Sequence, residues 1–232
     1  MNSIRKTSII VGVLYIAGTA AGIISAVFGP DLDAPDFLAN LSANEDQVFI
    51  RGLFEFTMAV LTVGIPIFLY PILKKYNEAL ALGHVVFRTI ETLLFTIGAI
   101  SLLTLLTLSQ KFVIAGAPDA SYFQTLATLL LSVREWEGGV FAVFVFSLSA
   151  LILNYILYRS LLIPRWLSGW GLIGATLYLG SGFLPLFGHD TRSTIFLLME
   201  APLALWEMIF AVLLIVKGFN PSAIASWSVK QI

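Results

Sequence analysis

The sequence predicts an all-α integral membrane protein, a six-transmembrane-helix bundle with both termini on the cytoplasmic side. Two observations support this fold class. Of the 232 residues, 58% are hydrophobic and only 12% are charged, whereas about 25% of the residues of a typical soluble domain are charged. The apolar residues also gather into long runs, and a bilayer core of about 30 Å requires about 20 of them in one helix.

Six apolar runs are long enough to cross a membrane. The segments between them are short, the longest covering residues 30–48, so the chain is expected to form a single membrane domain over residues 1–232. The expected spans lie near residues 8–29, 49–73, 82–109, 136–158, 166–187 and 194–217.

The first span begins after Arg5 and Lys6, as the hydrophobic region of a secretory signal peptide does, but it continues to Gly29. Because the hydrophobic region of a signal peptide has about 7–15 residues, this segment is expected to be an uncleaved helix. Gly18 and Gly22 form a small-xxx-small pair in it. The pair predicts close helix packing within the chain, and a homodimer formed through it is the alternative.

The fourth span has two alternative registers, because residues 122–158 are too many for one crossing and include Arg-Glu-Trp-Glu at 134–137. In the favoured register this tetrapeptide lies at the outer lip and residues 138–157 cross the membrane. Residues 120–133 then form an extracellular-side extension or a turn of helix at the lip. In the alternative register the helix enters near Ala127, and the tetrapeptide is buried.

The lysines and arginines predict the orientation, since cytoplasmic loops carry the positive charge. Eight of them lie beside the span ends on one side, against Lys111 and Arg192 on the other, while the first outer loop holds five acidic residues and no basic one. We therefore expect a multi-pass protein of the bacterial cytoplasmic (inner) membrane. The eight residues are Arg5, Lys6, Lys74, Lys75, Arg159, Arg165, Lys217 and Lys230.

Charged residues inside the spans are the candidate functional residues. A charge at the bilayer centre costs at least about 2.5–3.5 kcal/mol on insertion scales and must face the interior of the bundle. Depths counted at about 1.5 Å per residue sort these residues into two layers. The inner polar cluster, expected to bind a ligand or protons, is Arg88, Glu91 and Glu207. The outer polar cluster is Arg51, Glu55, Arg134, Glu137 and Glu200.

Both clusters contain more acidic than basic side chains, and the inner one has two glutamates for one arginine. In a dry interior a surplus carboxylate either stays protonated or takes a cationic partner, a metal or part in a proton-coupled step. The alternative is that these side chains form satisfied salt bridges and hydrogen bonds that only tie the helices together.

The sequence offers few of the residues that metal and enzyme sites require. It has no cysteine, which excludes disulfides, cysteine-ligated cofactors and thiol nucleophiles. His84 and His189 are the two histidines; they lack metal-ligand spacing, and His84 is expected at the membrane interface. Neither can be placed beside a serine such as Ser149. No metal site, no cofactor and no catalytic residue is therefore assigned, and a net charge of −1 argues against a nucleic-acid partner.

Four segments carry a family resemblance: Phe-Arg-Thr-Ile-Glu at 87–91, the run from Gly139 that ends in Leu-Tyr-Arg-Ser at 160, Ile-Pro-Arg-Trp-Leu-Ser-Gly at 163–169, and Trp-Glu at 206–207 leading to Val-Lys-Gly-Phe-Asn at 216–220. In order and spacing they resemble the uncharacterised bacterial membrane proteins of the domain of unknown function 4386 family. The resemblance implies six or more helices, no established activity, and family polar residues at Arg88, Glu91 and Glu207. Residues 134–137 depart from the family pattern.

The favoured function is a small-molecule or proton-coupled carrier or receptor that uses an intramembrane Arg/Glu pocket between the second, third and sixth spans. One alternative is an intramembrane enzyme acting on a lipid or isoprenoid, with Glu91 or Glu207 as acid or base. The other is a structural membrane subunit without pocket chemistry. The expected partners are the lipid bilayer and a small amphiphilic or cationic ligand.

Overall fold

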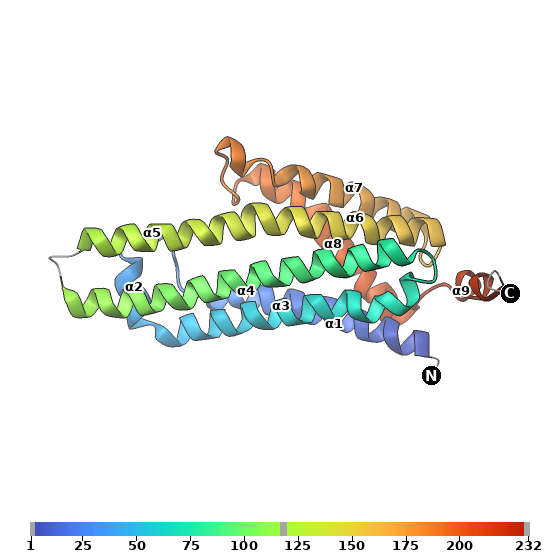
Figure 1. The fold of residues 1–232 in the computed structure, drawn as a ribbon, viewed down its shortest axis with the longest axis horizontal. Coiled ribbons are helices and arrows are strands. Elements are labelled where there is room, and N and C mark those ends of the chain that lie inside the picture. Colours follow the sequence, from blue (N-terminus) through green and yellow to red (C-terminus); the bar gives the residue numbers. More distant parts are fainter. Residues whose placement is uncertain (1–2, 117–119, 230–232) are drawn as a thin grey trace.

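The computed structural model describes residues 3–116 and 120–229, which form helices joined by short turns and contain no strand. Lys230, one of the eight basic residues that predict the orientation, lies outside the described residues. Both Ser3 and the last helix lie at one end of an elongated bundle, here called the terminal end (Figure 1). The opposite end is called the distal end.

Six helical segments are long and apolar enough to cross a membrane, which confirms the predicted all-α fold with six spans. The fourth runs without interruption from α5 through the π-helical turn η2 into α6, and two short helices, α2 (Phe37–Ala43) and α9 (Pro221–Val229), lie between or after the spans. The spanning segments are α1 (Ser3–Phe28), α3 (Glu45–Leu73), α4 (Glu78–Ala115), α5 (Ala120–Trp136) with η2 (Glu137–Phe141) and α6 (Ala142–Ser160), α7 (Arg165–Ser181) with the 3-10 turn η3 (Pro185–Phe187), and α8 (Thr194–Val216).

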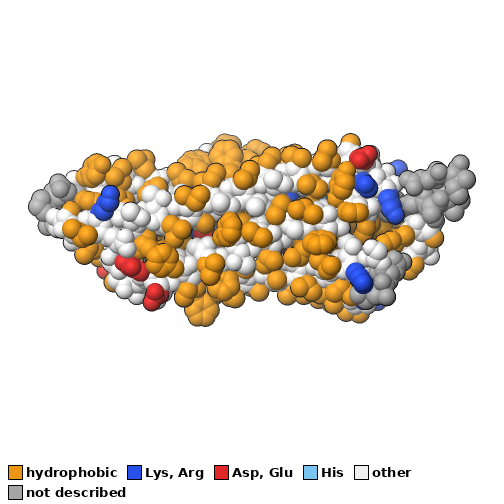
Figure 2. Space-filling model, turned by 60° about the horizontal axis from the view of Figure 1, so that its bottom comes forward, with side chains coloured by type: hydrophobic (Ala, Val, Ile, Leu, Met, Phe, Trp, Pro, Cys, Tyr) orange, Lys and Arg blue, Asp and Glu red, His pale blue; other side chains and the backbone are white. Residues whose placement is uncertain are grey.

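The spanning helices form a closed ring. Each packs against the next along the chain, in the order α1, α3, α4, α6, α7 and α8, and α8 returns to pack against α1. Large apolar side chains such as Leu93, Ile173 and Leu198 point away from the ring and are 59–67% exposed. Figure 2 shows such side chains along one whole face, with lysines and arginines concentrated toward the terminal end. This outer surface suits contact with lipid.

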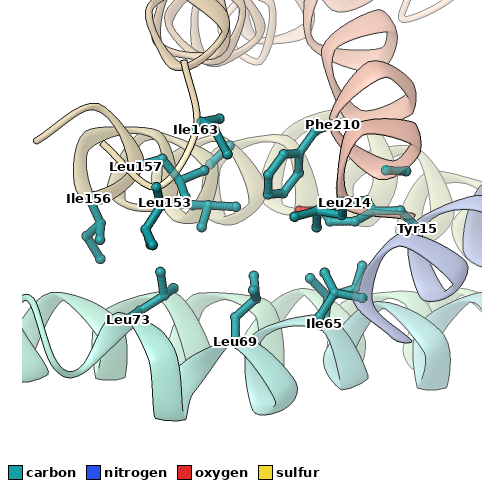
Figure 3. Close-up of a cluster of buried hydrophobic side chains, with 14 of the residues drawn as sticks. Tyr15, Ile65, Leu69, Leu73, Leu153, Ile156, Leu157, Ile163, Phe210 and Leu214 are labelled. Atoms are coloured by element: carbon teal, nitrogen blue, oxygen red, sulfur yellow. The ribbon is translucent and has the colours of Figure 1, made fainter. Parts of the chain in front are cut away.

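Inside the ring, the terminal half is filled by an apolar core. Leu69 and Leu73 of α3 face Leu153 of α6 and Phe210 and Leu214 of α8 (Figure 3), and all five are at most 1% exposed. Because lipid is as apolar as these side chains, tight packing rather than the hydrophobic effect holds the helices together. The core therefore closes the terminal half of the bundle.

Glycines allow the helix backbones to approach closely. A Cβ atom added at Gly12 of α1 would lie 2.6 Å from the carbonyl oxygen of Ala211 in α8, and one at Gly22 would lie 3.0 Å from Met58 Sδ in α3. Gly18 also faces α3. The Gly18/Gly22 pair therefore packs within the chain, as the favoured interpretation expects, and the homodimer stays a prediction.

The α4–α5 pair extends well past α7 and α8 at the distal end (Figure 1). At about 1.5 Å per residue, the 38 residues of α4 measure about 57 Å, beyond the roughly 30 Å of a bilayer core. Helix α2 covers this extension by packing Leu38 and Leu41 against Leu102 and Leu105. Residues 120–133 continue the helix of the fourth span, and their register relative to the membrane stays a prediction. The third helix is longer than the predicted 82–109.

Candidate functional site

The structure brings the predicted inner polar cluster together between α4 and α8. Nη1 of Arg88 donates to both carboxylate oxygens of Glu91, at 3.0 and 2.8 Å, and Nη2 donates to Oε1 of Glu207 at 3.4 Å. Arg88 and Glu91 are each 3% exposed. Their spacing of three residues puts both on one face of α4, as expected for a helix. The guanidinium also lies 4.5 Å from the ring centroid of Phe146, a favourable cation–π contact.

The position of Glu207 follows from that of its neighbour Trp206. The indole Nε1–H donates to the carbonyl of Leu167 in α7 at 2.9 Å, and the indole ring stacks on Phe210 at 4.9 Å. Trp206 thereby fixes the rotation of α8, and the Glu207 side chain faces the interior with 18% of its surface exposed. Because Arg88 is held more closely by Glu91, Glu207 keeps acceptor capacity for another partner.

These side chains border an inner cavity of about 210 Å³. Tyr15 of α1, Tyr178 of α7 and Glu200 of α8 also line it. Glu200 was expected in the outer cluster, but the structure places it here, with no ion pair to any described residue. Three carboxylates and one guanidinium therefore surround the inner cavity.

The rest of the outer polar cluster centres on Glu55. Its Oε1 accepts from Nε of Arg51 at 3.0 Å and from Nη2 of Arg134 at 2.7 Å, and its Oε2 accepts from Nη1 of Arg134 at 3.2 Å. Arg134 also donates to the carbonyl oxygen of Gly98. Arg134, the first residue of the 134–137 segment, thus links α5 to α3 and α4 and is mostly buried, whereas Glu135 is exposed.

Glu137 begins the π-helical turn η2 and, unlike Glu55, makes no ion pair with a described residue. The residue is 9% exposed, and its Oε1 is buried without a hydrogen bond among the described residues. Oε2 lies so close to α4 that a Cβ added at Gly98 would be 2.5 Å from it. Glu137 lines a middle cavity of about 250 Å³, together with Glu55 and Arg134. An unpaired buried carboxylate oxygen at a cavity wall is a ready acceptor for water or a ligand.

A larger outer cleft of about 840 Å³ lies beyond the middle cavity. Arg51, Arg134 and Glu135 line it, and Arg192 contacts Asp33 at its mouth. The amide of Arg192 donates to Asp190 at 2.7 Å, and this hydrogen bond lowers the pKa of the exposed Asp190 carboxyl. The mouth is therefore strongly charged.

The outer cleft, the middle cavity and the inner cavity adjoin one another. Gly138 lines all three, while Met58 and Phe95 line both the middle and the inner cavity. A Cβ added at Gly138 would meet no atom within 4 Å, so the interior is open at this point. We call these three adjoining spaces, which follow one another from the distal side toward Arg88, Glu91 and Glu207, the route.

Sequence reasoning missed several residues of this route. Tyr15, Tyr178, Gly98 and Gly138 lie in apolar or glycine-containing spans, where no local pattern separates a cavity wall from ordinary packing. These residues can be recognised as cavity walls only when the order of the helices around the ring is known.

His84 is a further correction. It was expected at the membrane interface, but it is 1% exposed, and its Nδ1 lies 2.6 Å from Ser149 Oγ on α6. This pair does not make an evident hydrolytic site. His84 Nε2 has no hydrogen-bond partner among the described residues, and neither side chain lines any of the three spaces of the route. No acidic side chain among the described residues hydrogen-bonds the imidazole, as a nucleophilic triad requires.

The fold and the site define a multi-pass membrane protein with an acidic inner cavity that adjoins a middle cavity and an outer cleft. The family model described as Domain of unknown function (DUF4386) matches residues 10–218, and the chain belongs to this family. No curated protein and no solved structure matches the chain.

Proposed function

We propose that this protein is a carrier or receptor of the bacterial cytoplasmic membrane that binds a small cationic molecule in its inner cavity. The observation that carries the proposal is the route from the distal end to the buried carboxylates, with Gly138 shared by all three spaces. The distal end faces outward in this proposal, as the distribution of basic residues indicates.

The charges around the inner cavity favour a cation. Arg88 makes two contacts of 3.0 Å or less with Glu91. The negative charges of Glu207 and Glu200 are therefore not fully neutralised by Arg88. Tyr15 and Tyr178 add ring faces that attract a cation at a desolvated site. An anion would meet three carboxylates and gain little from an arginine already in use.

The size of the inner cavity limits the ligand. Its volume of about 210 Å³ is below the roughly 300–1,000 Å³ of cavities that hold drug-sized ligands. A simple organic ammonium ion fits this space, whereas a whole phospholipid or isoprenoid chain does not. The volume therefore favours the carrier or receptor over the lipid-modifying enzyme.

A carrier needs a second opening toward the terminal end. The apolar core around Leu69, Leu153 and Phe210 blocks that side, so a carrier of this design must part α3 and α6 from α8 there. A cation and protons exchanged across the membrane would use the same carboxylates in turn. A receptor needs no such opening.

The proposal is tested by ligand binding to the purified protein in detergent. Small alkylammonium ions should raise its unfolding temperature, and alkyl sulfonates of the same size should not. Glu207→Gln and Glu200→Gln should each weaken ammonium binding by at least about tenfold, or about 1.4 kcal/mol. Asp46→Asn is the control, because Asp46 is exposed at the distal end and lines none of the three spaces.

Two results contradict the proposal: no ammonium ion binds, or the Glu207→Gln and Glu200→Gln proteins bind as well as the Asp46→Asn protein. Either result favours a structural role for the polar clusters. Uptake of a bound ion into proteoliposomes identifies a carrier, and binding without uptake identifies a receptor.

A further inference from the structure

A second concave site lies at the terminal end, away from the route. It is a groove of about 530 Å³ between the α6–α7 turn and the α8–α9 turn. The α6–α7 turn overlaps the family-resemblance segment at 163–169, and the α8–α9 turn overlaps residues 216–220 of the last such segment. The proposed function gives neither turn a role. Arg165 and Trp166 line the groove from the α6–α7 side, and Lys217, Gly218 and Asn220 line it from the α8–α9 side.

Hydrogen bonds between the two turns hold the groove in shape. The amide of Asn220 donates to the carbonyl of Leu162 at 2.9 Å, and its side-chain Nδ2 donates to the carbonyl of Leu161 at 3.3 Å. Leu161 has a φ of 58°, a conformation rarely adopted by a residue other than glycine. Gly218 has a φ of 76°, which glycine adopts at little cost. The two turns therefore form one preorganised unit.

The groove is cationic and amphiphilic. Arg165 and Lys217 line it, no acidic residue does, and neither cation makes an ion pair with a described residue. The Arg165 guanidinium lies 5.6 Å from the ring centroid of Tyr158, which limits its range of positions. The remaining lining side chains are mainly apolar, and Trp166 is 63% exposed, as is common for tryptophans at a membrane–water interface.

We propose that this groove binds an anionic phospholipid, with the headgroup phosphate between Arg165 and Lys217 and an acyl chain along the exposed apolar surface beside Trp166. A free phosphate ion would gain from the two cations but not from the apolar lining. The location fits a lipid, because the groove lies where α7 begins and α8 ends, and the ends of membrane-spanning helices lie near the lipid headgroups. Basic pockets at this level are typical sites for anionic lipids.

The test is lipid binding measured by native mass spectrometry on the detergent-solubilised protein, with phosphatidylglycerol and phosphatidylcholine of identical chains. The wild-type protein should retain phosphatidylglycerol in preference to phosphatidylcholine. The double variant Arg165→Gln/Lys217→Gln should bind phosphatidylglycerol about 10- to 30-fold more weakly, since each cation near a membrane surface contributes a factor of about five.

The matched control is Lys74→Gln/Lys75→Gln, which removes two charges at the same end of the bundle. Lys74 also lies over a tyrosine ring, that of Tyr70 at 5.4 Å, but neither lysine lines the groove. This variant should retain phosphatidylglycerol within about twofold of wild type if the contribution is specific to the groove.

A single-residue variant distinguishes a loss of lipid binding from a loss of folded protein. The side chain of Lys217 is exposed and makes no hydrogen bond or ion pair with a described residue, so Lys217→Gln should unfold at the wild-type temperature and still lose several-fold in lipid binding.

Three results overturn the proposal. Arg165→Gln/Lys217→Gln and Lys74→Gln/Lys75→Gln could lose equal amounts of lipid binding, or the wild-type protein could retain the two lipids equally. Inorganic phosphate at the same concentration could also displace phosphatidylglycerol, which would show a free-phosphate site instead. Ammonium binding in the inner cavity stays unchanged in Lys217→Gln, so the two proposals fail independently.

Discussion

Arg88 is the most deeply buried cation of the spanning helices, and its surroundings determine what it does. Removing a guanidinium from water costs several kcal/mol, which the contacts to Glu91, Glu207 and the Phe146 ring must offset. A buried ion pair of this kind adds little net stability compared with apolar packing. Its presence at a cavity wall therefore fits a role in binding better than a role in folding.

Loss of Arg88 should destabilise the protein strongly. Arg88→Ala leaves Glu91 buried and unpaired, so the free energy of unfolding in detergent should fall by about 3–5 kcal/mol. Adding Glu91→Gln to Arg88→Ala should recover more of this loss than adding Glu207→Gln, because Glu91 makes the shorter contacts and is less exposed. Strictly additive effects in both double variants would show that the pairs do not interact.

At the residue scale, the sequence predicted Arg88, Glu91 and Glu207 together because helical spacing and depth follow from simple counting. Glu200, predicted in the outer cluster, lines the inner cavity for a physical reason. Glu200 and Glu207 are seven residues apart, so they share one face of α8 and lie about 10 Å from each other along the axis. A cavity that extends along the helix accommodates both, and counting depths could not predict its length.

At the scale of elements, the joint between α5 and α6 shapes the route. The π-helical turn η2 adds a residue to one helical turn and brings Glu137 and Gly138 to the interior, and such bulges are frequent at functional sites. Gly98 of α4 lies opposite this turn. Because glycine has no side chain, Glu137 and Arg134 can approach the α4 backbone there. The sequence placed the 134–137 segment at a lip but could not show this turn, since it depends on contacts with another helix.

Substitutions at the two glycines should have opposite effects. Gly98→Ala places a methyl group 2.5 Å from Glu137 Oε2 and should destabilise the protein by about 1–3 kcal/mol. Gly138→Ala meets no atom within 4 Å and should be neutral or stabilise by up to about 1 kcal/mol, because alanine favours a helix over glycine. Thermal unfolding of the two proteins in the same detergent measures the difference. Equal unfolding temperatures would contradict the close packing of η2 on α4.

The whole molecule is a ring of six spanning helices, with an apolar core toward the terminal end and the route between the distal end and the inner cavity. Hydropathy predicted the number and order of the spans, because each must supply about 20 apolar residues whatever its neighbours are. The closure of the ring by α1 and α8, and the packing of α2 on the distal extension, depend on long-range contacts that no local pattern contains.

The orientation in the membrane can be tested with single cysteines, since the chain has none of its own. Ser42→Cys at the distal end and Ser222→Cys in α9 at the terminal end are nearly isosteric changes. An impermeant thiol reagent added to intact cells should label the first, because the basic residues predict that the distal end faces outward. The second should be labelled only after the membrane is opened. Labelling of both positions in intact cells would contradict the six-span topology.

The most direct test of the account is whether the interior at Gly138 can be reached from the distal side. Gly138→Cys introduces a thiol where the three spaces meet, and Gly169→Cys is the control, since Gly169 also has room for a Cβ but lines none of them. A small cationic thiosulfonate added at the distal side of reconstituted vesicles should modify Gly138→Cys rapidly and Gly169→Cys slowly or not at all, and alkylammonium ions should slow the first reaction. An unreactive Gly138→Cys in vesicles where Ser42→Cys reacts fully would contradict a route to the buried carboxylates.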